Sequence, residues 1–390
     1  MKIDLDRCRD HTPATKNLIH FNNAGCALSP SCVTEAVIAH LNLEQEVGGY
    51  EAAVIAQKRI SGFYEQFARL LNCSPTQIAY IENASRAWDI ALYSIDWQEG
   101  DQIVTVDNEY VSNYVGLLHL QKQKNIEIVL LPCDAKGVVD CSQVRDAITD
   151  RTRMLALTHV SSQRGDIQPA EKIGQIAKEF NLLYLLDACQ SAGQIDLDVN
   201  KLQCDFLCGT GRKYLRGPRG TGFLYASDRM LKTSTPLFAD NHSASWTGPS
   251  SYAFQEDGSR FETWERSLAG MIGLAEAVKY ACDIGVSHIE ERVSMLAMEL
   301  QSKLRNTPSV TVMERSENIS GIVTFQKEGI DASVLASMLS RHNINTSISK
   351  QDNAQLDLAL QGIGDVNRAS IHYYNTTDEI DRFIEAVARC

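Results

Sequence analysis

The stretch Leu182-Leu183-Tyr184-Leu185-Leu186-Asp187-Ala188-Cys189-Gln190-Ser191 sets a carboxylate directly after a continuous apolar and aromatic run. Continuous rather than alternating apolar residues are typical of a strand whose sheet is covered by helices on both faces. Open sheets of this kind bind ligands at the carboxyl ends of their strands, which is where Asp187 falls. An acidic residue in this place is also a common cap of the following helix, so Asp187 by itself leaves both interpretations open.

Similar short runs recur on both sides of this stretch, between about residues 78 and 226. We expect strands over residues 103–106, 127–131, 154–158, 182–186, 205–208 and 222–225. Helix-length segments separate them, and over 170–180 the apolar residues at 173, 176, 177 and 180 share one helical face. This alternation of strands and helices predicts an α/β fold with a mostly parallel sheet.

The pattern changes after the last of these strands. Residues 232–262 are rich in Pro, Gly, Asn and Ser, so we expect a long irregular segment of the kind that is usually functional or interfacial. Helical periodicity returns over about 269–305, and is followed by strands at 321–325 and 369–373, a helix at 334–341 and a last helix from residue 378. We therefore predict a large domain at 19–265 and a small α+β C-terminal domain at 266–390, which also takes in residues 1–18.

Composition excludes several classes of protein. The chain has 390 residues and a formal net charge of −12, which argues against a general nucleic-acid or anionic-membrane surface. Its N-terminus is charged and lacks the apolar core of a secretory signal, and no apolar run approaches the roughly 18 residues of a membrane span. Eleven scattered cysteines without a C-x-x-C motif indicate reduced thiols. We expect a cytoplasmic protein with no metal, nucleic-acid or membrane partner.

A lysine follows the expected strand at 205–208, inside the segment Gly209-Thr210-Gly211-Arg212-Lys213-Tyr214-Leu215-Arg216-Gly217-Pro218-Arg219-Gly220-Thr221-Gly222. This segment fits neither G-x-G-x-x-G nor the P-loop pattern, because Tyr214 stands where the third glycine belongs and no Gly-Lys-Ser/Thr occurs. Alone, it is also typical of a basic surface loop. A carboxylate and a lysine at neighbouring strand ends suit pyridoxal phosphate, since a lysine amine forms its Schiff base and an anion keeps its ring nitrogen protonated.

The phosphate of that cofactor needs a helix N-terminus, where free N–H groups and the helix dipole attract an anion. Residues Glu82-Asn83-Ala84-Ser85-Arg86-Ala87 follow an expected strand at 78–81 and open a helical pattern. By itself this is an ordinary helix cap. Together with Asp187 and Lys213, in this order along the chain, it predicts a pyridoxal-phosphate site.

These segments together resemble the class V aminotransferases of the fold-type I pyridoxal-phosphate enzymes, which include cysteine desulfurases, isopenicillin-N-epimerase-like proteins and carbon–sulfur lyases. The resemblance runs from His20-Phe21-Asn22-Asn23-Ala24-Gly25 to Asn367-Arg368-Ala369-Ser370-Ile371-His372, nearly the whole chain. It implies a mostly parallel, seven-stranded-type sheet with a smaller α+β C-terminal domain. It also implies a homodimer with active sites at the subunit boundary, where residues 259–266 would approach the cofactor phosphate of the other subunit.

The resemblance assigns residues to the ring of the cofactor. Lys213 matches the Schiff-base lysine, which is the predicted catalytic residue, and Asp187 matches the partner of the pyridinium nitrogen. Gln190 matches the residue that binds the phenolic oxygen. Tyr110 stands where desulfurases stack a histidine on the ring, and a phenol also stacks, although it lacks the acid–base role of an imidazole.

The resemblance also assigns residues to the two anionic groups of the site. Ala84 and Ser85 match the cradle of the cofactor phosphate, and Thr210 supplies another hydroxyl. Arg212 stands where many relatives have a histidine that touches the phosphate, and a guanidinium suits this task. Arg368 matches the arginine that binds the α-carboxylate of the substrate.

Two departures from the family pattern bear on the reaction. Desulfurases carry a nucleophilic cysteine shortly before the carboxylate-binding arginine, whereas residues 344–367 contain no cysteine. Because a persulfide needs a thiolate there, that type of desulfurase activity is disfavoured. In His159-Val160-Ser161-Ser162-Gln163-Arg164-Gly165, Ser162 stands where relatives usually have an asparagine, so Ser162 or Gln163 is expected to take over that contact with substrate.

The reaction that we predict is β-elimination from cysteine, cystine or a cysteine S-conjugate by a carbon–sulfur lyase, giving pyruvate, ammonia and a sulfur product. Lys213, freed from the cofactor, would remove the α-proton of the amino acid. Transamination and epimerisation are the alternatives within the same class. A binding protein on a degenerate enzyme fold is the alternative outside it, since a fold alone does not fix a function.

Overall fold

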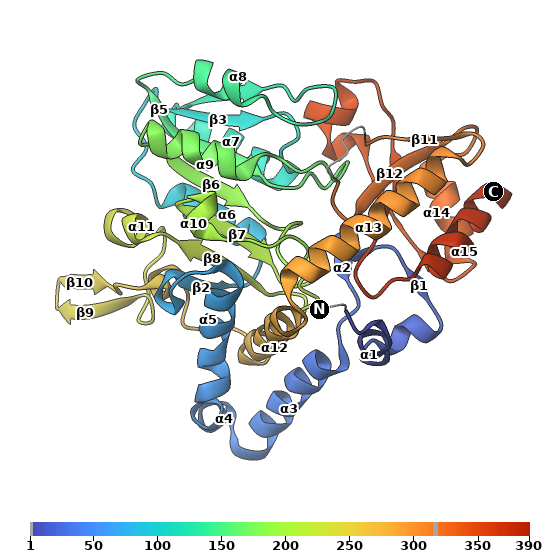
Figure 1. The fold of residues 1–390 in the computed structure, drawn as a ribbon. Coiled ribbons are helices and arrows are strands. Elements are labelled where there is room, and N and C mark those ends of the chain that lie inside the picture. Colours follow the sequence, from blue (N-terminus) through green and yellow to red (C-terminus); the bar gives the residue numbers. More distant parts are fainter. Residues whose placement is uncertain (1–2, 315–318) are drawn as a thin grey trace.

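The computed structural model describes residues 3–314 and 319–390, and its centre is a seven-stranded sheet (Figure 1). The strand order is β2-β8-β7-β6-β5-β3-β4; β8 runs antiparallel to both of its neighbours, and the other pairs are parallel. The strands are β2 (Ile78–Ile81), β3 (Gln102–Val106), β4 (Glu127–Leu131), β5 (Thr152–Thr158), β6 (Leu183–Asp187), β7 (Phe206–Thr210) and β8 (Gly222–Ala226). The predicted α/β sheet is therefore confirmed.

Helices cover both faces of this sheet, which explains its continuous apolar strands. In β6, Tyr184 and Leu186 pack on one face, while Leu183 and Leu185 pack on the other. The first face is covered by α5 (Gln57–Leu71), α8 (Cys141–Asp146), α9 (Ala170–Glu179), α10 (Val199–Leu202) and α12 (Leu268–Ile284). The second face is covered by α6 (Ala84–Tyr93), α7 (Val111–Lys124) and α11 (Asp228–Thr233).

The smaller part of the chain forms a second hydrophobic core beside the large sheet. A four-stranded antiparallel sheet of order β11-β12-β15-β14 comprises β11 (Val310–Val312), β12 (Ile322–Lys327), β14 (Ser347–Ser349) and β15 (Val366–Ser370). Helices α13 (Val286–Arg305), α14 (Ala332–Ser340) and α15 (Thr377–Arg389) pack on it. The short strand β1 (Ile19–His20) pairs with β13 (Ile344–Asn345) and ties the N-terminal part of the chain to this core. The predicted boundaries of the two domains stay a prediction.

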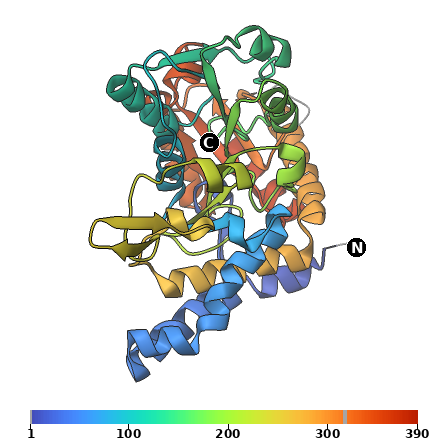
Figure 2. The same ribbon diagram turned by 90° about the vertical axis from the view of Figure 1, so that its left-hand side faces the viewer.

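The remaining elements are short or lie at the edge of the molecule. The helices are α1 (Leu5–Asp10), α2 (Asn23–Cys26), α3 (Ser31–Val47) and α4 (Gly49–Ile55). Single turns occur at η1 (Pro13–Lys16), η2 (Pro75–Gln77), η3 (Gly258–Phe261), η4 (Gln351–Asn353) and η5 (Gln355–Ala359). Figure 2 shows that α4 and the hairpin of β9 (Ala244–Gly248) and β10 (Ser251–Phe254) both project away from the body.

Three sequence expectations differ from the structure. Residues 232–262 are not wholly irregular, because β9 and β10 form a hairpin around Gly248 and Pro249 within them. The helical stretch at 269–305 is two helices, since Gly285 has a positive φ of 95° that ends α12 before α13 begins. The strand expected at 369–373 lies at Val366–Ser370, and the residues after it turn toward α15.

One stretch, Asn23–Val47, is long and apolar enough to cross a membrane by length and composition, with a mean hydropathy of 1.2. Pro30 interrupts it between α2 and α3, and α3 lies along α12. Helices of globular proteins also pass such a test, so this stretch does not indicate a membrane protein. The cytoplasmic location stays a prediction.

Candidate active site

The predicted lysine and carboxylate meet at the carboxyl ends of three neighbouring strands. Thr158, the last residue of β5, pairs with Asp187 at the end of β6, and Asp187 pairs with Cys208 in β7. The chain then leaves β7 and reaches Lys213 three residues later. Lys213 is only 7% exposed, and its Nζ lies 5.6 Å from the centroid of the Tyr110 ring. The structure therefore brings Lys213, Asp187 and Tyr110 to one edge of the sheet, as predicted.

The environment of Lys213 favours its uncharged amine. Burial lowers the pKa of Lys213 most, and the positive charges of Arg212 and Arg368 lower it further, while Asp187 and Cys189 oppose this change. An amine without its extra proton is the form that attacks a carbonyl carbon or accepts a proton. The location of Lys213 therefore suits both covalent attachment of a cofactor and removal of a proton from a substrate.

The Asp187 carboxylate is held from two sides and is 3% exposed. Its Oδ1 accepts a hydrogen bond from the Cys189 N–H at 2.7 Å, and its Oδ2 accepts one from Asn113 Nδ2, also at 2.7 Å. These bonds fix the direction of the carboxylate, which stays free to accept a further proton donor. A protonated ring nitrogen is such a donor.

A second buried carboxyl group supports the first and was not identified from the sequence. Glu109 Oε1 accepts hydrogen bonds from Asn113 Nδ2 at 2.9 Å, from the Tyr110 N–H at 2.8 Å and from the Thr158 hydroxyl. Burial raises the pKa of Glu109 to about 7, and the charge of Asp187 adds to this rise. Glu109 and Asn113 are four residues apart at the start of α7, and this spacing was the available signal. The pair links Tyr110 to Asp187.

The Gln190 side chain has one polar atom with a hydrogen-bond partner and one without among the described residues. Its Nε2 donates to the Ala24 carbonyl at 3.2 Å, while its Oε1 is buried and has no partner among the described residues. A buried amide oxygen without a partner is unusual and indicates a missing group or a reversed amide. A reversed amide would place Oε1 against the Ala24 carbonyl oxygen, so the orientation with Nε2 on Ala24 is retained, and the contact of Gln190 with the phenolic oxygen of pyridoxal phosphate stays a prediction.

The predicted phosphate cradle lies at the N-terminus of α6. Asn83 caps this helix by accepting from the Arg86 N–H at 2.9 Å, and the first amides, Ala84 and Ser85, have no partner inside the helix. Gly222 connects this end to the lysine segment, because it pairs with Ile81 on one side and with Thr210 on the other. A Cβ at Gly222 would lie 2.7 Å from the Gly209 carbonyl oxygen and 3.1 Å from the Asn83 backbone, so only glycine allows this close approach.

The side chains of Thr210 and Arg212 form hydrogen bonds to backbone carbonyl groups outside α6. The Thr210 hydroxyl donates to the Thr221 carbonyl at 3.3 Å, and Arg212 Nη1 donates to the Gly25 carbonyl. Neither bond reaches α6, so the phosphate contacts of Thr210 and Arg212 stay predictions. Thr210 nevertheless lies near the N-terminus of α6, because it pairs with Gly222 of β8, and Gly222 pairs with Ile81 of β2.

Arg368 lies in β15 and reaches across to the large sheet. Its Nη1 donates to the Ser162 carbonyl at 2.8 Å and its Nε donates to the Ser347 hydroxyl at 3.0 Å. No ion pair of Arg368 exists among the described residues, and burial lowers its pKa. A guanidinium without a carboxylate partner is suited to bind an anionic ligand. Ser162 contributes its carbonyl here, whereas its hydroxyl and that of Ser161 donate to Gln163 Oε1.

A second buried arginine fixes the segment that carries Lys213. Arg216 Nε donates to the Leu28 carbonyl at 2.7 Å, Nη1 to the Tyr373 hydroxyl at 2.5 Å and Nη2 to the Thr12 hydroxyl at 2.6 Å. Its guanidinium also lies over the ring of Tyr374, 4.5 Å from the centroid. Arg216 therefore joins the lysine segment to the N-terminal and C-terminal parts of the chain.

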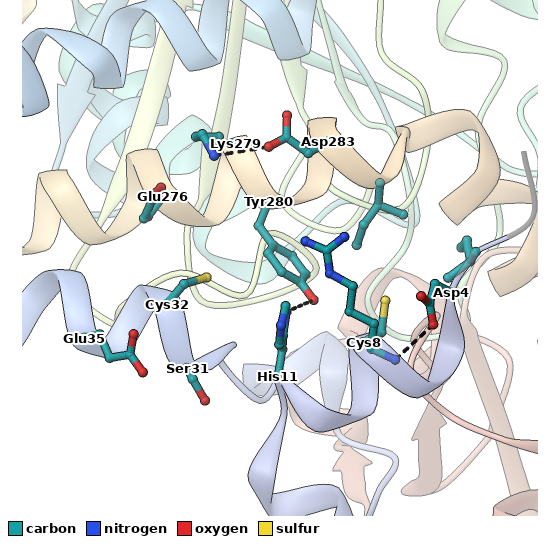
Figure 3. Close-up of a pocket in the computed structure, with 13 residues that line it drawn as sticks. Asp4, Cys8, His11, Ser31, Cys32, Glu35, Glu276, Lys279, Tyr280 and Asp283 are labelled. Carbon is teal, nitrogen blue, oxygen red and sulfur yellow. Dashed lines mark hydrogen bonds and ion pairs between the residues drawn. The ribbon is translucent and has the colours of Figure 1, made fainter.

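A cavity of about 500 Å³ lies between α1, α3 and α12 and is separate from the residues described above. Figure 3 shows the residues that line it. His11 and Tyr280 point toward each other in it, with His11 Nδ1 3.0 Å from the Tyr280 hydroxyl. Tyr280 also lies beside Arg216, 5.9 Å from ring centroid to guanidinium. The cavity thus borders the structural contacts of Arg216 rather than the site at the strand ends.

A reactive amine beside a carboxylate, a helix N-terminus free to bind phosphate and an unpaired Gln190 oxygen together fit pyridoxal phosphate. On this mixed seven-stranded sheet, they define a fold-type I pyridoxal-phosphate enzyme. The chain belongs to the class V aminotransferase family, whose sequence profile matches residues 19–383. The predicted family, fold and cofactor are confirmed.

Similar proteins support this assignment over nearly the whole chain. A probable cysteine desulfurase of Methanothermobacter thermautotrophicus is 29% identical, over 97% of this chain and 94% of the relative. The apo structure of cysteine desulfurase from Thermococcus onnurineus NA1 is 26% identical with a TM-score of 0.92, covering 100% of this chain and 98% of that one. The cystine C–S lyase C-DES, solved with its product cysteine persulfide, has a TM-score of 0.88 at 23% identity, covering 97% and 99%.

Proposed function

We propose that this protein is a carbon–sulfur lyase that removes the sulfur substituent of cysteine, cystine or a cysteine S-conjugate by β-elimination. Cysteine and one water would give pyruvate, ammonia and hydrogen sulfide, and cystine and one water would give pyruvate, ammonia and cysteine persulfide. The observation that carries the proposal is Arg368, whose guanidinium lies next to the lysine site without a carboxylate partner among the described residues. An amino acid offers the carboxylate that this guanidinium lacks.

Each residue of the site has a task in this proposal. Bound pyridoxal phosphate supplies a ring that accepts the electrons left when the α-proton is removed. Asp187 holds a proton at the ring nitrogen, and Tyr110 covers one ring face and excludes water from it. Arg368 orients the substrate through its carboxylate. Lys213, whose lowered pKa favours the neutral amine, accepts the α-proton and can deliver it to the departing sulfur.

The fate of the sulfur distinguishes this proposal from the activity named for most relatives. Several are called cysteine desulfurases, while C-DES is called a cystine C–S lyase. Residues 344–367 of this chain contain no cysteine, so a thiolate from this segment does not take up the sulfur. The sulfur would instead leave as a small molecule, which agrees with the lyase reaction.

An elimination assay tests the proposal. Purified protein loaded with pyridoxal phosphate is incubated with L-cysteine, L-cystine or S-methyl-cysteine, and pyruvate and the released thiol or sulfide are measured. We expect equal amounts of pyruvate and sulfur product, with no persulfide left on the protein. Exchange of the α-proton in heavy water without pyruvate would contradict elimination. A keto acid that retains its sulfur substituent would indicate transamination.

We also propose that the protein is a homodimer in which residues 259–266 approach the cofactor phosphate of the other subunit. Large apolar side chains are exposed on the two projecting elements: Tyr50, Val54, Ile55, Trp246 and Tyr252. Cavities of about 480 and 660 Å³ flank Glu262–Ser267. Glu262 holds this segment by accepting hydrogen bonds from Tyr64 and from the Tyr80 N–H. An exposed apolar surface of this kind is typical of an interface between subunits.

Changing this surface should separate the subunits. Sedimentation at micromolar concentration is expected to show a dimer for the wild type and a monomer for the double variant Tyr50→Asp/Trp246→Asp, because two charges would be buried in an apolar interface. The monomer is expected to bind pyridoxal phosphate more weakly. Val334→Asp, which changes an exposed valine of α14 away from the two projecting elements, is the control and should remain dimeric. A monomeric wild type would contradict the proposal.

A further inference from the structure

Residues 350–365 form a segment directly beside Arg368. They connect β14 to β15, two paired strands in which Ser347 lies opposite Arg368 and Ser349 lies opposite Val366. The segment folds into the short turns η4 and η5, and its Leu358 and Ala354 are buried against Met313 and Val366. The segment therefore rests on the small sheet and ends within three residues of the predicted carboxylate-binding arginine.

A buried ion pair joins this segment to the large sheet. Arg164 Nη2 lies 2.7 Å from Asp357 Oδ1, and the two side chains are only 8% and 6% exposed. The same Nη2 donates to Gln361 Oε1 at 2.6 Å, and Gln361 Nε2 donates to Asp357 Oδ1 at 2.8 Å. The three side chains close a ring of contacts, in which one guanidinium holds two positions of the segment.

Few other polar contacts hold the segment to the large sheet. Its backbone-to-backbone hydrogen bonds are internal, from Asn353 N–H to the Lys350 carbonyl through to Ile363 N–H to the Leu358 carbonyl, and the Asp365 carbonyl accepts from Gln326 of the small sheet. In the described part of the chain, the hydrogen bonds and the ion pair between the segment and residues 159–168 all involve Arg164. Loss of this one side chain would leave the segment attached only to the small sheet.

A second polar contact, between Arg368 and Ser162, joins the same two parts of the chain as the Arg164–Asp357 ion pair. Arg368 Nη1 donates to the Ser162 carbonyl at 2.8 Å, and Arg164 follows Ser162 by two residues. Ser162 and Arg164 thus hold Arg368 and the segment that precedes it. Gly165, with φ 80° and no room for a Cβ beside the Ile322 carbonyl, fixes the turn that presents both residues.

We propose that Arg164 is a positioning residue that locks residues 351–365 in place as a fixed wall of the amino-acid site, keeping Arg368 aligned for the substrate carboxylate. This inference rests on the proposed function in one respect, namely that Arg368 binds the amino acid. A locked segment does not carry its own side chains to the substrate. The sulfur substituent therefore leaves the site as a small molecule, because this fixed segment does not move a sulfur-accepting side chain toward it.

Hydrogen exchange measures the lock without using activity. In the protein loaded with pyridoxal phosphate, we expect amides of 351–365 to exchange at least about tenfold faster in Arg164→Met than in the wild type, because Asp357 would be left buried without its partner. Gln361→Leu changes an exposed residue and removes one contact of Arg164, and a smaller increase of about threefold is expected. Arg145→Met, which breaks the exposed Arg145–Glu179 pair, is the matched control and should leave 351–365 unchanged.

Steady-state kinetics on L-cysteine test the positioning role. Arg164→Met is expected to raise KM about tenfold and to change kcat less than about threefold, because binding of the carboxylate is weakened while Lys213 is untouched. Unchanged exchange in both Arg164→Met and Gln361→Leu would overturn the lock. Faster exchange with an unchanged KM would overturn the positioning role. If the wild-type protein yields no pyruvate, the proposed reaction is wrong. The lock is then tested by hydrogen exchange, and the positioning role by the dissociation constant for L-cysteine. A dissociation constant that is unchanged in Arg164→Met would overturn the positioning role.

Discussion

Replacing Lys213 by alanine is expected to abolish turnover and the absorbance band of bound cofactor near the visible edge. The Lys213 amine performs two tasks, namely covalent attachment of pyridoxal phosphate and transfer of the α-proton. General acid–base catalysis alone contributes about 10²- to 10⁴-fold to a rate, so the loss should exceed that range. No other lysine is described near the strand ends at Thr158, Asp187 and Thr210, so no neighbour should replace it.

The measurement combines a spectrum with chemical trapping. Borohydride reduction of wild-type protein should add the mass of the reduced cofactor to the peptide that contains Lys213, and Lys213→Ala should give no labelled peptide. Lys213→Arg keeps a cation in the pocket but is expected to be equally inactive, because a guanidinium neither forms the bond nor accepts a proton near neutral pH. Lys232→Ala, at an exposed position at the end of α11, is the control for handling and should retain colour and activity. A labelled, coloured Lys213→Ala protein would rule out the assignment.

Replacing Arg368 by alanine is expected to lower kcat/KM for the amino acid by about 30- to 5 × 10³-fold, with most of the change in KM. Truncating one partner of a buried charge pair costs about 2–5 kcal/mol, which corresponds to this range. Arg368→Lys keeps the charge but loses the planar fork, so it should recover only part of the affinity.

The same substitution should have the opposite effect on stability. Without substrate, Arg368 has two neutral acceptors, Ser162 and Ser347, and no carboxylate partner among the described residues. Removing a partly buried cation of this kind relieves a desolvation cost, so Arg368→Ala should melt at the same temperature as the wild type or above it. Ser347→Ala removes one contact of Arg368 and is the control, with a modest rise in KM expected. A variant with a much lower melting temperature and an unchanged KM would make Arg368 a structural residue.

Much of the fold and the central part of the site could be predicted from the sequence. Apolar runs that end in Asp187 and precede Lys213 signal strand ends, and parallel strands bring their carboxyl ends to one edge. Glu109 and Asn113 were missed because their four-residue spacing reports only the contact between the two of them, whereas the Asp187 carboxylate that Asn113 also binds lies 74 residues further along the chain. Asp357 and Arg164 were missed for the same reason, since their contact joins two different sheets.

The remaining differences have local causes. The β9–β10 hairpin lies among turn-forming residues, and its exposed strands lack the continuous apolar run of a buried strand. Gly285 divides α12 from α13 without interrupting the apolar periodicity, so the sequence on each side fits a single helix. The orientation of Arg212 toward Gly25 depends on the path of the N-terminal segment, which sequence spacing does not report.

Arg216 has a consequence for synthesis of the chain on the ribosome. Its contacts reach back 204 residues to Thr12 and forward 157 residues to Tyr373, with both ends of the protein held by one side chain. Contacts of such long sequence separation form late, and a chain that emerges from its N-terminus cannot complete them until Tyr373 has appeared. The lysine segment therefore reaches its final shape only after Tyr373 has been added, so a shorter nascent chain would not yet present a finished pocket to the cofactor.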